Sequence, residues 1–400
     1  MNYKPKIQII TKPGCNYCNL TKKLLISHSC DWEESSALFI QGKSFPQIFV
    51  ENIYIGGYAD LINLPELWQL TMFKPSMSYK PFKFPTAMEL AKLHENLHWV
   101  EDEISLADDI MCWESSDLSQ DERDYTLNIL RLFTQSDVSV GNIYYDIFIP
   151  LFQNNELRCM MGSFAAREGI HQRAYALLTD TLGVPDSIYK DFLDFSELSE
   201  KMEFMSEMKI NTLENIALSI IKAVFNEGVS LFSSFLMLLN FQRFGKMIGM
   251  GKVVEWSIRD ESLHVQGMTK IFKWFIDSYP FILRPEFTRK VVELADMLIS
   301  VEYTFIDLIF KVTPQHPAGT LYIPQLTAID TKNFIQFILY KRLVNLGFNI
   351  SKYNIPNPVP WVTWIINGMD HTNFFENRVT EYSINGLIGL WETVYSETII

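Results

Sequence analysis

The sequence predicts a multidomain chain in which a small α/β domain precedes a larger, all-α helical bundle. In the first 70 residues, two short apolar runs flank one amphipathic segment, and from Thr86 onward apolar residues recur at helical spacing over long stretches. Two Glu-x-x-His pairs lie within those stretches, so they place polar, chemically capable side chains inside an apolar bundle. The bundle is therefore the part of the chain expected to carry a buried site.

Composition excludes several classes of protein. The net charge of −13 disfavours nucleic acid as a partner, because phosphate binding needs clustered lysine and arginine. The N-terminus lacks the apolar core of a signal peptide. A membrane span needs roughly 20 mostly uncharged residues, whereas the most apolar stretch, 216–239, is interrupted by Lys222, Asn226 and Glu227. Five cysteines, two of them in a Cys-x-x-Cys, suit a reducing compartment. We expect a cytoplasmic protein that binds neither nucleic acid nor membrane.

The individual elements follow from local patterns. Residues 7–10 and 47–50 read as short buried strands, with a helix over 16–28 between them. Pro75, Pro81 and Pro85 make 71–85 a linker or an extended segment that lies over a neighbour. Helices are expected over 88–109, 120–151, 156–182, 213–244, 253–279 and 285–310. The predicted division is 1–70 for the α/β domain, 71–85 for the linker, 86–360 for the bundle and 361–400 for a C-terminal tail.

The two pairs, Glu168-x-x-His171 and Glu261-x-x-His264, have the spacing of metal ligands. Positions i and i+3 lie on one face of a helix, so each pair aims a carboxylate and an imidazole at the same point. Two such pairs, with one carboxylate from each of two other helices, form the di-iron or di-manganese centre of a ferritin-like bundle. The sequence thus predicts a dinuclear metal site.

The two further carboxylates are Asp137 and Glu227. Glu227 interrupts an apolar helix. The alternative to a metal ligand is a carboxylate hydrogen-bonded in the core, although buried acidic residues are rarely left unpaired. The motif alone is not decisive, because Glu95-x-x-His98 has the same form. Glu168/His171 and Glu261/His264 differ from this third pair because they occur together with the other candidate ligands.

From about Thr86 to its C-terminus, the chain resembles the small, radical-generating subunit of class I ribonucleotide reductase. The resemblance rests on Ser136-Asp137, Arg167-Glu168-Gly-Ile-His171-Gln-Arg-Ala-Tyr175, Asn226-Glu227 and Arg259-Asp260-Glu261-Ser-Leu-His264. It implies two iron ions, or manganese and iron, per chain. It makes Asp137 and Glu227 terminal ligands, Glu168 and Glu261 bridges, and His171 and His264 the nitrogen ligands.

The same resemblance assigns radical chemistry. Tyr175, four residues after His171 and so on the same helical face, would form the tyrosyl radical; its alternative is ordinary core packing. Trp99 would pass the radical equivalent onward, with Asp260 as the partner that orients His171. Tyr382 would be the interfacial tyrosine of a tail that docks on a large subunit. The alternative interpretation of Tyr382 is a solvated side chain in the tail. A homodimer is also implied.

Cys15-Asn-Tyr-Cys18 follows a predicted strand and opens a predicted helix. A helix N-terminus stabilises a thiolate, so Cys15 would attack and Cys18 would resolve a mixed disulfide. A bare Cys-x-x-Cys can equally bind a metal ion.

Further motifs favour redox chemistry. Phe45-Pro46-Gln47-Ile48-Phe49 and Gly56-Gly57-Tyr58-Ala59-Asp60 make this region resemble a glutaredoxin of thioredoxin-like fold. The resemblance implies that Pro46 is cis and faces Cys15. It also implies a glutathione site bordered by Lys12, Tyr17, Phe45 and Asp60. The spacing between Cys18 and Pro46 leaves little room for the usual second helix.

The predicted function is therefore that of a ribonucleotide reductase small subunit with a fused dithiol reductant, glutathione serving as the reductant of that domain. The main alternative is a ferritin-like di-iron oxygenase or desaturase with a redox domain. A storage or scaffolding bundle with a redox tag is a third possibility. The sequence does not distinguish iron from manganese, or diphosphate from triphosphate substrates.

Overall fold

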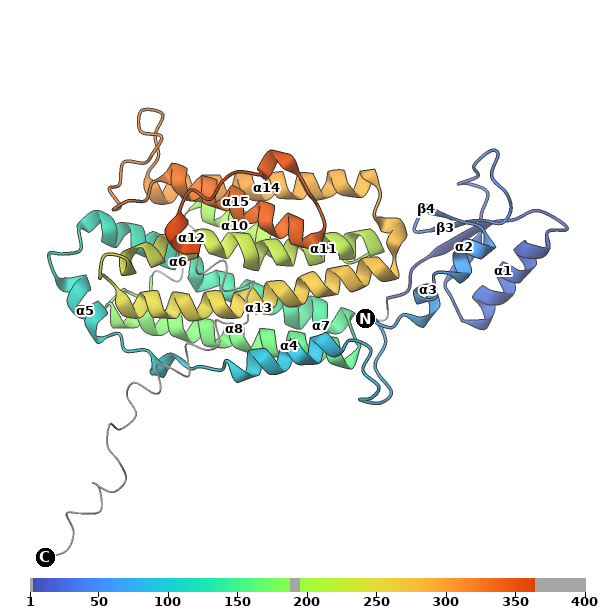
Figure 1. Cartoon of the computed structure of the whole chain (residues 1–400), viewed down its shortest axis with the longest axis horizontal. Coiled ribbons are helices and arrows are strands. Elements are labelled where there is room, and N and C mark those ends of the chain that lie inside the picture. The colour runs from blue at the N-terminus through green and yellow to red at the C-terminus, as the bar shows by residue number, and fades with distance from the viewer. Residues whose placement is uncertain (1–2, 188–194, 364–400) are drawn as a thin grey trace, which may run out of the picture. The chain divides into compact units, whose positions relative to one another are not determined.

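The computed structural model describes residues 3–187 and 195–363 (Figure 1). The described residues up to Pro358 belong to one compact unit. Nearly all of the predicted C-terminal tail, including Tyr382, lies outside the described residues.

The N-terminal part contains a four-stranded mixed sheet. Its strands are β1 (Ile7–Ile10), β2 (Trp32–Glu34), β3 (Gln47–Val50) and β4 (Ile53–Gly56), in the order β2-β1-β3-β4. Strand β1 pairs parallel with β2 and antiparallel with β3, and β3 pairs antiparallel with β4. The helices are α1 (Asn16–Ser27), α2 (Tyr58–Ile62) and α3 (Glu66–Gln69).

The predicted strands at 7–10 and 47–50 are confirmed as β1 and β3. Both are apolar runs whose side chains are largely buried. Strands β2 and β4 were not predicted. Strand β2 is three residues long and carries two glutamates, so its pattern gives no apolar signal. Residues 35–46, between β2 and β3, form turns and bends without a helix, as the short spacing indicated.

The rest of the described chain is predominantly helical. Its α-helices are α4 (Pro85–Asn96), α5 (Ala107–Glu114), α6 (Gln120–Asn142), α7 (Ile149–Leu151), α8 (Asn155–Thr181), α10 (Ser196–Ser206), α11 (Leu213–Phe225), α12 (Leu231–Gln242), α13 (Ile248–Ser278), α14 (Pro285–Phe310) and α15 (Ala328–Leu346). Two π-helices, η2 (Ile143–Phe148) and η4 (Asn226–Ser230), join α6 to α7 and α11 to α12. Short 3₁₀ turns are η1 (Glu101–Glu103), η5 (Pro280–Ile282), η6 (Ser351–Tyr353) and η7 (Pro360–Val362).

The expected helix over 88–109 was wrong as a single element. Helix α4 ends at Asn96, and the backbone is extended at Val100 before α5 begins at Ala107. The break puts Trp99 in a non-helical segment, where its side chain is fully buried. Apolar residues continue across the break, so periodicity alone could not reveal it. Helices α10 and α15 were also missed.

The long helices lie side by side, and this arrangement builds the interior (Figure 1). Helix α13 packs against α8, α11, α12 and η4, while α6 packs against α8. Residues Leu213–Gln242, which comprise α11, η4 and α12, are long and apolar enough to cross a membrane, but they are almost entirely buried within the bundle. The interior between α6, α8, η4 and α13 is where the predicted ligands lie.

Candidate metal centre and dithiol

Four elements bring the predicted ligands together. Helix α8 supplies two of them, α13 supplies two, and α6 and η4 supply one carboxylate each. All are at most 2% exposed: Asp137, Glu168, His171, Glu227, Glu261 and His264. Ionisable groups are rarely buried so completely unless they pair with one another or bind a metal ion.

Glu168 and Glu261 each face both histidines. The Oε2 atom of Glu168 lies 3.4 Å from Nδ1 of His171, and its Oε1 atom lies 3.1 Å from Nδ1 of His264. Glu261 repeats the pattern, with Oε1 3.3 Å from His171 Nδ1 and Oε2 3.3 Å from His264 Nδ1. Each carboxylate therefore turns one oxygen toward each imidazole. It lies between two candidate metal positions, one beside His171 and one beside His264.

The remaining two carboxylates divide between these positions. Glu227 Oε2 lies 3.8 Å from Nδ1 of His264. Asp137 accepts a 3.3 Å hydrogen bond from Ser136 and interacts electrostatically most strongly with His171 among the predicted ligands. The set has a pseudo-symmetric arrangement: one terminal carboxylate and one histidine at each end, and two carboxylates between them.

The donor atoms fit a pair of metal ions. Among the described residues, Asp137 Oδ2, both carboxylate oxygens of Glu168 and Glu261, and Nδ1 of His264 are buried without a hydrogen-bond partner. The ligand atoms of Glu168, Glu261 and His264 all lie within 4.8 Å of one another. Buried polar atoms without partners are costly, and oxygen with imidazole nitrogen suits iron or manganese.

The ionisation of the cluster reflects burial and mutual charge. Burial raises the pKa of Asp137 and of Glu227 well above the usual range. Burial also opposes ionisation of Glu168, but the two histidines outweigh it and lower its pKa to about 2. Burial lowers the pKa of His264, yet the neighbouring carboxylates, Glu261 first, raise it to about 10. Protons therefore occupy several of these groups when no metal neutralises them.

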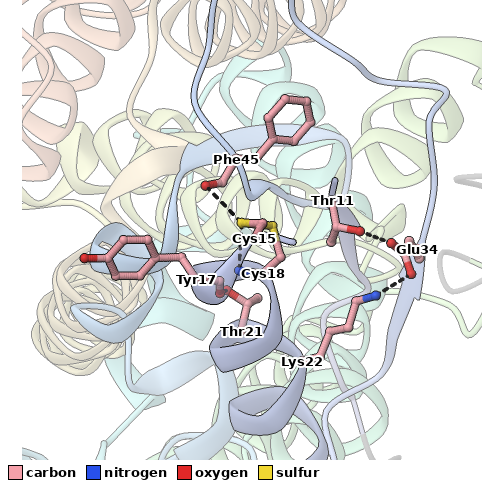
Figure 2. The surroundings of a disulfide bond; sticks show 8 residues. All are labelled: Thr11, Cys15, Tyr17, Cys18, Thr21, Lys22, Glu34 and Phe45. Carbon is pink, nitrogen blue, oxygen red and sulfur yellow. Dashed lines mark hydrogen bonds and ion pairs between the residues drawn. A yellow bond between two sulfur atoms is a disulfide. The ribbon is translucent and has the colours of Figure 1, made fainter. Parts of the chain in front are cut away.

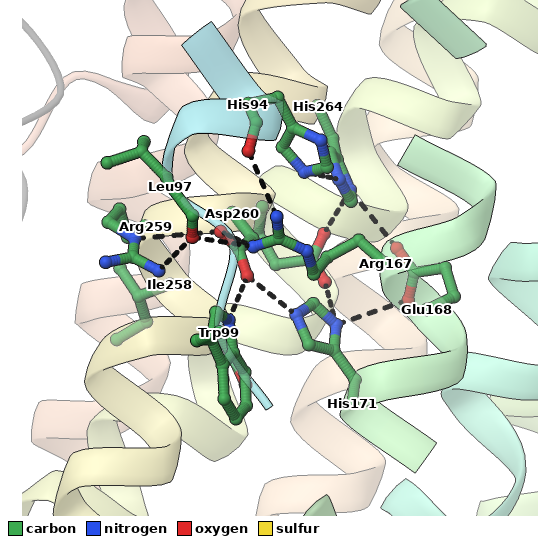
Figure 3. Close-up of polar contacts among 12 residues, drawn as sticks. His94, Leu97, Trp99, Arg167, Glu168, His171, Ile258, Arg259, Asp260 and His264 are labelled. Atoms are coloured by element: carbon green, nitrogen blue, oxygen red, sulfur yellow. Dashed lines mark hydrogen bonds and ion pairs between the residues drawn. The ribbon is translucent and has the colours of Figure 1, made fainter. Parts of the chain in front are cut away.

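A hydrogen-bonded chain leads from His171 to Trp99 (Figure 3). Asp260 Oδ2 lies 3.3 Å from Nε2 of His171 and accepts a 2.7 Å hydrogen bond from the Trp99 indole. Its Oδ1 accepts a 2.8 Å bond from Arg167. Burial raises the pKa of Asp260, but His171 and Arg167 outweigh it, so this carboxyl stays ionised. The predicted partners Trp99 and Asp260 are thus brought together at the outer edge of His171.

Sequence reasoning missed His94. Its Nε2 lies 3.1 Å from Nε2 of His264 (Figure 3). Its Nδ1 lies 2.6 Å from Ser163 Oγ. His94 lies on the buried face of α4, four residues after Leu90 and three after Ala91, so its position was visible in the pattern. The neighbouring Glu95-x-x-His98 motif has the spacing of a ligand pair, but both of its side chains are exposed. Those two side chains are not part of the cluster.

Tyr175 lies in an aromatic environment on α8. Its ring stacks on Phe133 with a centroid distance of 4.4 Å, and Phe133 in turn stacks on Phe235 at 5.5 Å. Its hydroxyl lies 3.5 Å from Oγ of Ser257, a long hydrogen bond. Burial raises its pKa well above the usual range, with Asp137 the next contributor, so the phenol is neutral. A cavity of about 180 Å³ adjoins Tyr175 and Phe133.

The N-terminal cysteines form a disulfide at the start of α1 (Figure 2). Cys15 is the N-cap residue, and its sulfur accepts a 3.2 Å hydrogen bond from the Cys18 amide. The Phe45–Pro46 peptide bond is cis, as predicted, and the Phe45 carbonyl lies 3.7 Å from the Cys15 sulfur. The first thiol is therefore the one that the helix N-terminus contacts.

The other residues predicted near the dithiol have mixed placements. Lys12 is exposed and lies over the Phe45 ring at 5.4 Å, and Tyr17 is exposed with its ring 5.9 Å from that of Tyr58. The exposed Asp60 accepts a 2.7 Å hydrogen bond from the Gly57 amide. None of these three described side chains makes a hydrogen bond to the cysteines, so their role in glutathione binding stays a prediction.

Residues 76–358 match the family model described as "Ribonucleotide reductase, small chain". A protein of Invertebrate iridescent virus 6, named "Probable ribonucleoside-diphosphate reductase small subunit 376L", is 35% identical over 362 residues, which cover 82% of this chain and 99% of that protein.

Two solved structures share the fold. The ribonucleotide reductase R2 subunit from Clostridium botulinum has a TM-score of 0.65 at 20% identity, covering 72% of this chain and 90% of that one. The dimanganese(II) NrdF protein of Streptococcus sanguinis has a TM-score of 0.59 at 18% identity, covering 74% of this chain and all of that one. At these identities the likeness concerns the fold alone.

Proposed function

The chain belongs to the ribonucleotide reductase small-chain family, and we propose that it generates a tyrosyl radical for the reduction of ribonucleotides to deoxyribonucleotides. The observation that carries the proposal is the placement of Glu168 and Glu261, each of which turns one oxygen toward His171 and the other toward His264. This is the arrangement that two bridged metal ions require. Because a relative is named a ribonucleoside-diphosphate reductase, we propose nucleoside diphosphates as substrates.

The proposed ligands have distinct roles. Asp137 and His171 would hold one ion, Glu227 and His264 the other, and Glu168 and Glu261 would bridge the two. When bound, two iron ions, or manganese and iron, would activate oxygen, which would serve as the oxidant. The protein contributes a buried oxygen- and nitrogen-rich site whose unpaired acceptors lie inside the bundle.

Tyr175 is the proposed radical site. Its phenol is buried and neutral, and its ring stacks on Phe133. Trp99 and Asp260 would carry the radical equivalent away from the metal centre, because their hydrogen bond continues the contact of Asp260 with His171. Tyr382 would continue the route in the C-terminal tail.

We further propose that residues 1–70 are a glutaredoxin-like domain with Cys15 as attacking thiolate and Cys18 as resolving thiol. Three observations support this: the disulfide at the N-terminus of α1, the cis peptide bond before Pro46, and the strand order β2-β1-β3-β4. Each cycle of ribonucleotide reduction oxidises a cysteine pair on the large subunit. A fused dithiol, itself reduced by glutathione bound near Lys12, Tyr17, Phe45, Pro46 and Asp60, would restore that pair.

The proposed assembly follows from this function. The chain would form a homodimer in the cytoplasm and dock on a large subunit through residues 361–400. Residues 71–85 would link the redox domain to the bundle, which would extend from 86 to 360.

The test begins with metal-free protein loaded with Fe(II) in the absence of oxygen. Oxygen is then added, and the sample is followed by absorption and electron paramagnetic resonance. We expect a tyrosyl signal that is lost in Tyr175→Phe but kept in Tyr125→Phe, which removes another fully buried phenol. Two-electron oxygen consumption without any tyrosyl signal would favour the oxygenase alternative.

A further inference from the structure

A second tyrosine lies at the metal centre. The Tyr144 hydroxyl donates a 3.0 Å hydrogen bond to Oε2 of Glu227, and its side chain is fully buried. The bond is direct, whereas the hydroxyl of Tyr175 has Ser257 as its hydrogen-bond partner at 3.5 Å. Tyr144 is thus bonded to a proposed ligand, although no motif singled it out.

The position of Tyr144 follows from the helix that carries it. It lies seven residues after Asp137, which is close to two helical turns, so both side chains lie on the same face of α6 and its continuation η2. Three neighbours surround the ring: Phe164 at 6.0 Å, His264 at 6.1 Å and Phe148 at 6.4 Å between centroids. Within this packing the hydroxyl points toward Glu227.

Glu227 comes from a second π-helix. The backbone of η4 is held from outside by two buried cations: Arg342 Nε donates to the Gly228 carbonyl at 3.0 Å, and Lys201 Nζ donates to the Ser230 carbonyl at 3.2 Å. These contacts fix the backbone on which Glu227 is mounted, but they do not fix the angle of its carboxylate. π-Helical segments occur frequently at functional sites.

We infer that Tyr144 is a positioning residue of the metal centre, whose hydroxyl holds the Glu227 carboxylate in front of His264 before an ion arrives. The inference rests on the proposed function, because it needs Glu227 and His264 to be ligands. The bonded oxygen, Oε2, is the Glu227 atom that lies 3.8 Å from His264 Nδ1. The phenol hydroxyl donates this bond to Oε2, and the bond also satisfies a buried acceptor.

The other metal position has a corresponding partner. Asp260 holds the outer nitrogen of His171, and groups that orient a metal ligand in this way typically contribute about 10–100-fold to metal affinity or activity. Tyr144 acts instead on a carboxylate ligand and is uncharged. The Glu227 carboxylate is therefore oriented by the neutral Tyr144 hydroxyl, which adds no charge to the metal centre.

The test uses Tyr144→Phe, which keeps the ring and removes the hydrogen bond. Metal-free protein is titrated with Mn(II) under anaerobic conditions, and the signal of free Mn(II) is followed by electron paramagnetic resonance. We expect the parent to bind two ions per chain, and the variant to bind one of them about 10–100-fold more weakly. Equal or tighter binding of both ions in the variant would overturn the inference.

Two further variants separate positioning from folding. Tyr125→Phe removes a buried hydroxyl that has no hydrogen-bond partner among the described residues, so it should bind both ions like the parent. Replacing Tyr144 by 4-aminophenylalanine restores a donor on the same ring and should recover most of the affinity. Failure of this donor to recover any affinity would also overturn the inference. If the parent itself binds no Mn(II), the proposed function fails, whatever Tyr144 does.

Discussion

Trp99 and Asp260, 161 residues apart in the sequence, are joined by a 2.7 Å hydrogen bond from the indole to Oδ2. The same carboxylate contacts His171 and forms a buried ion pair with Arg167. The Trp99 indole and the Arg167 guanidinium donate to Asp260, and the charges of Arg167 and His171 keep this buried carboxyl ionised by lowering its pKa. Asp260 thus links the proposed metal ligand His171 to Trp99, which is buried in the described segment between α4 and η1.

Replacing Asp260 by asparagine should uncouple Trp99 from His171. The substitution keeps the size of the side chain but leaves Arg167 without its charge partner, and breaking a buried ion pair costs about 3–5 kcal/mol. We expect a lower thermal unfolding temperature and nucleotide reduction reduced about 10–100-fold. Asp102→Asn, an exposed change in η1, is the matched control. Parent-like turnover in Asp260→Asn would exclude this carboxylate from the radical route.

The ligand assignment predicts a contrast between two histidines of the same motif. Glu168→Ala and His264→Ala should each lose most of the bound metal, because the remaining carboxylates stay buried and unpaired. His98→Ala should keep it, since His98 is exposed and lies outside the cluster. Metal content measured by elemental analysis after gel filtration gives the result. Equal loss in His98→Ala and His264→Ala would contradict the assignment.

Metal loading should release protons. Without metal, burial raises the pKa of Asp137 and Glu227, and the surrounding carboxylates raise that of His264 to about 10, so these groups hold protons to a higher pH than usual. A bound ion displaces those protons, so affinity should rise as the pH is raised. Calorimetry in buffers of different ionisation enthalpy counts the protons released. Binding that releases none would show that the metal-free cluster is already deprotonated.

The dithiol predicts a split between two reductants. Cys15→Ser removes the sulfur that the Cys18 amide contacts at the start of α1. Turnover with glutathione and an added large subunit should be lost, while turnover with excess dithiothreitol should stay close to that of the parent. Cys159→Ser, which changes an exposed free cysteine, is the control. Glutathione-driven turnover at the parent rate in Cys15→Ser would exclude the redox role.

Much of the site could be predicted because its signals are local. The spacing of Glu168 with His171, and of Glu261 with His264, is a property of a single helix turn, and both pairs do face one interior. The same holds for the Cys15–Cys18 pair at a helix N-terminus. The helical class of the bundle also follows from periodicity that needs no knowledge of neighbours.

Other features needed the tertiary structure. The break after Asn96 was missed, because apolar residues continue through it and only packing shows that Trp99 turns inward. Strand β2 was missed, because it is recognised by pairing with β1 and not by its own composition.

The sequence by itself determined which residue types form the candidate metal ligands and the dithiol, since each motif is set within one helix or one turn. Only the tertiary structure decided what surrounds them: His94 beside His264, Tyr144 on Glu227 and Arg167 on Asp260. The first two contacts join residues 170 and 83 positions apart, and the third joins residues 93 apart. Such contacts depend on how separate helices pack, and helix packing is not encoded in the spacing of any one of them.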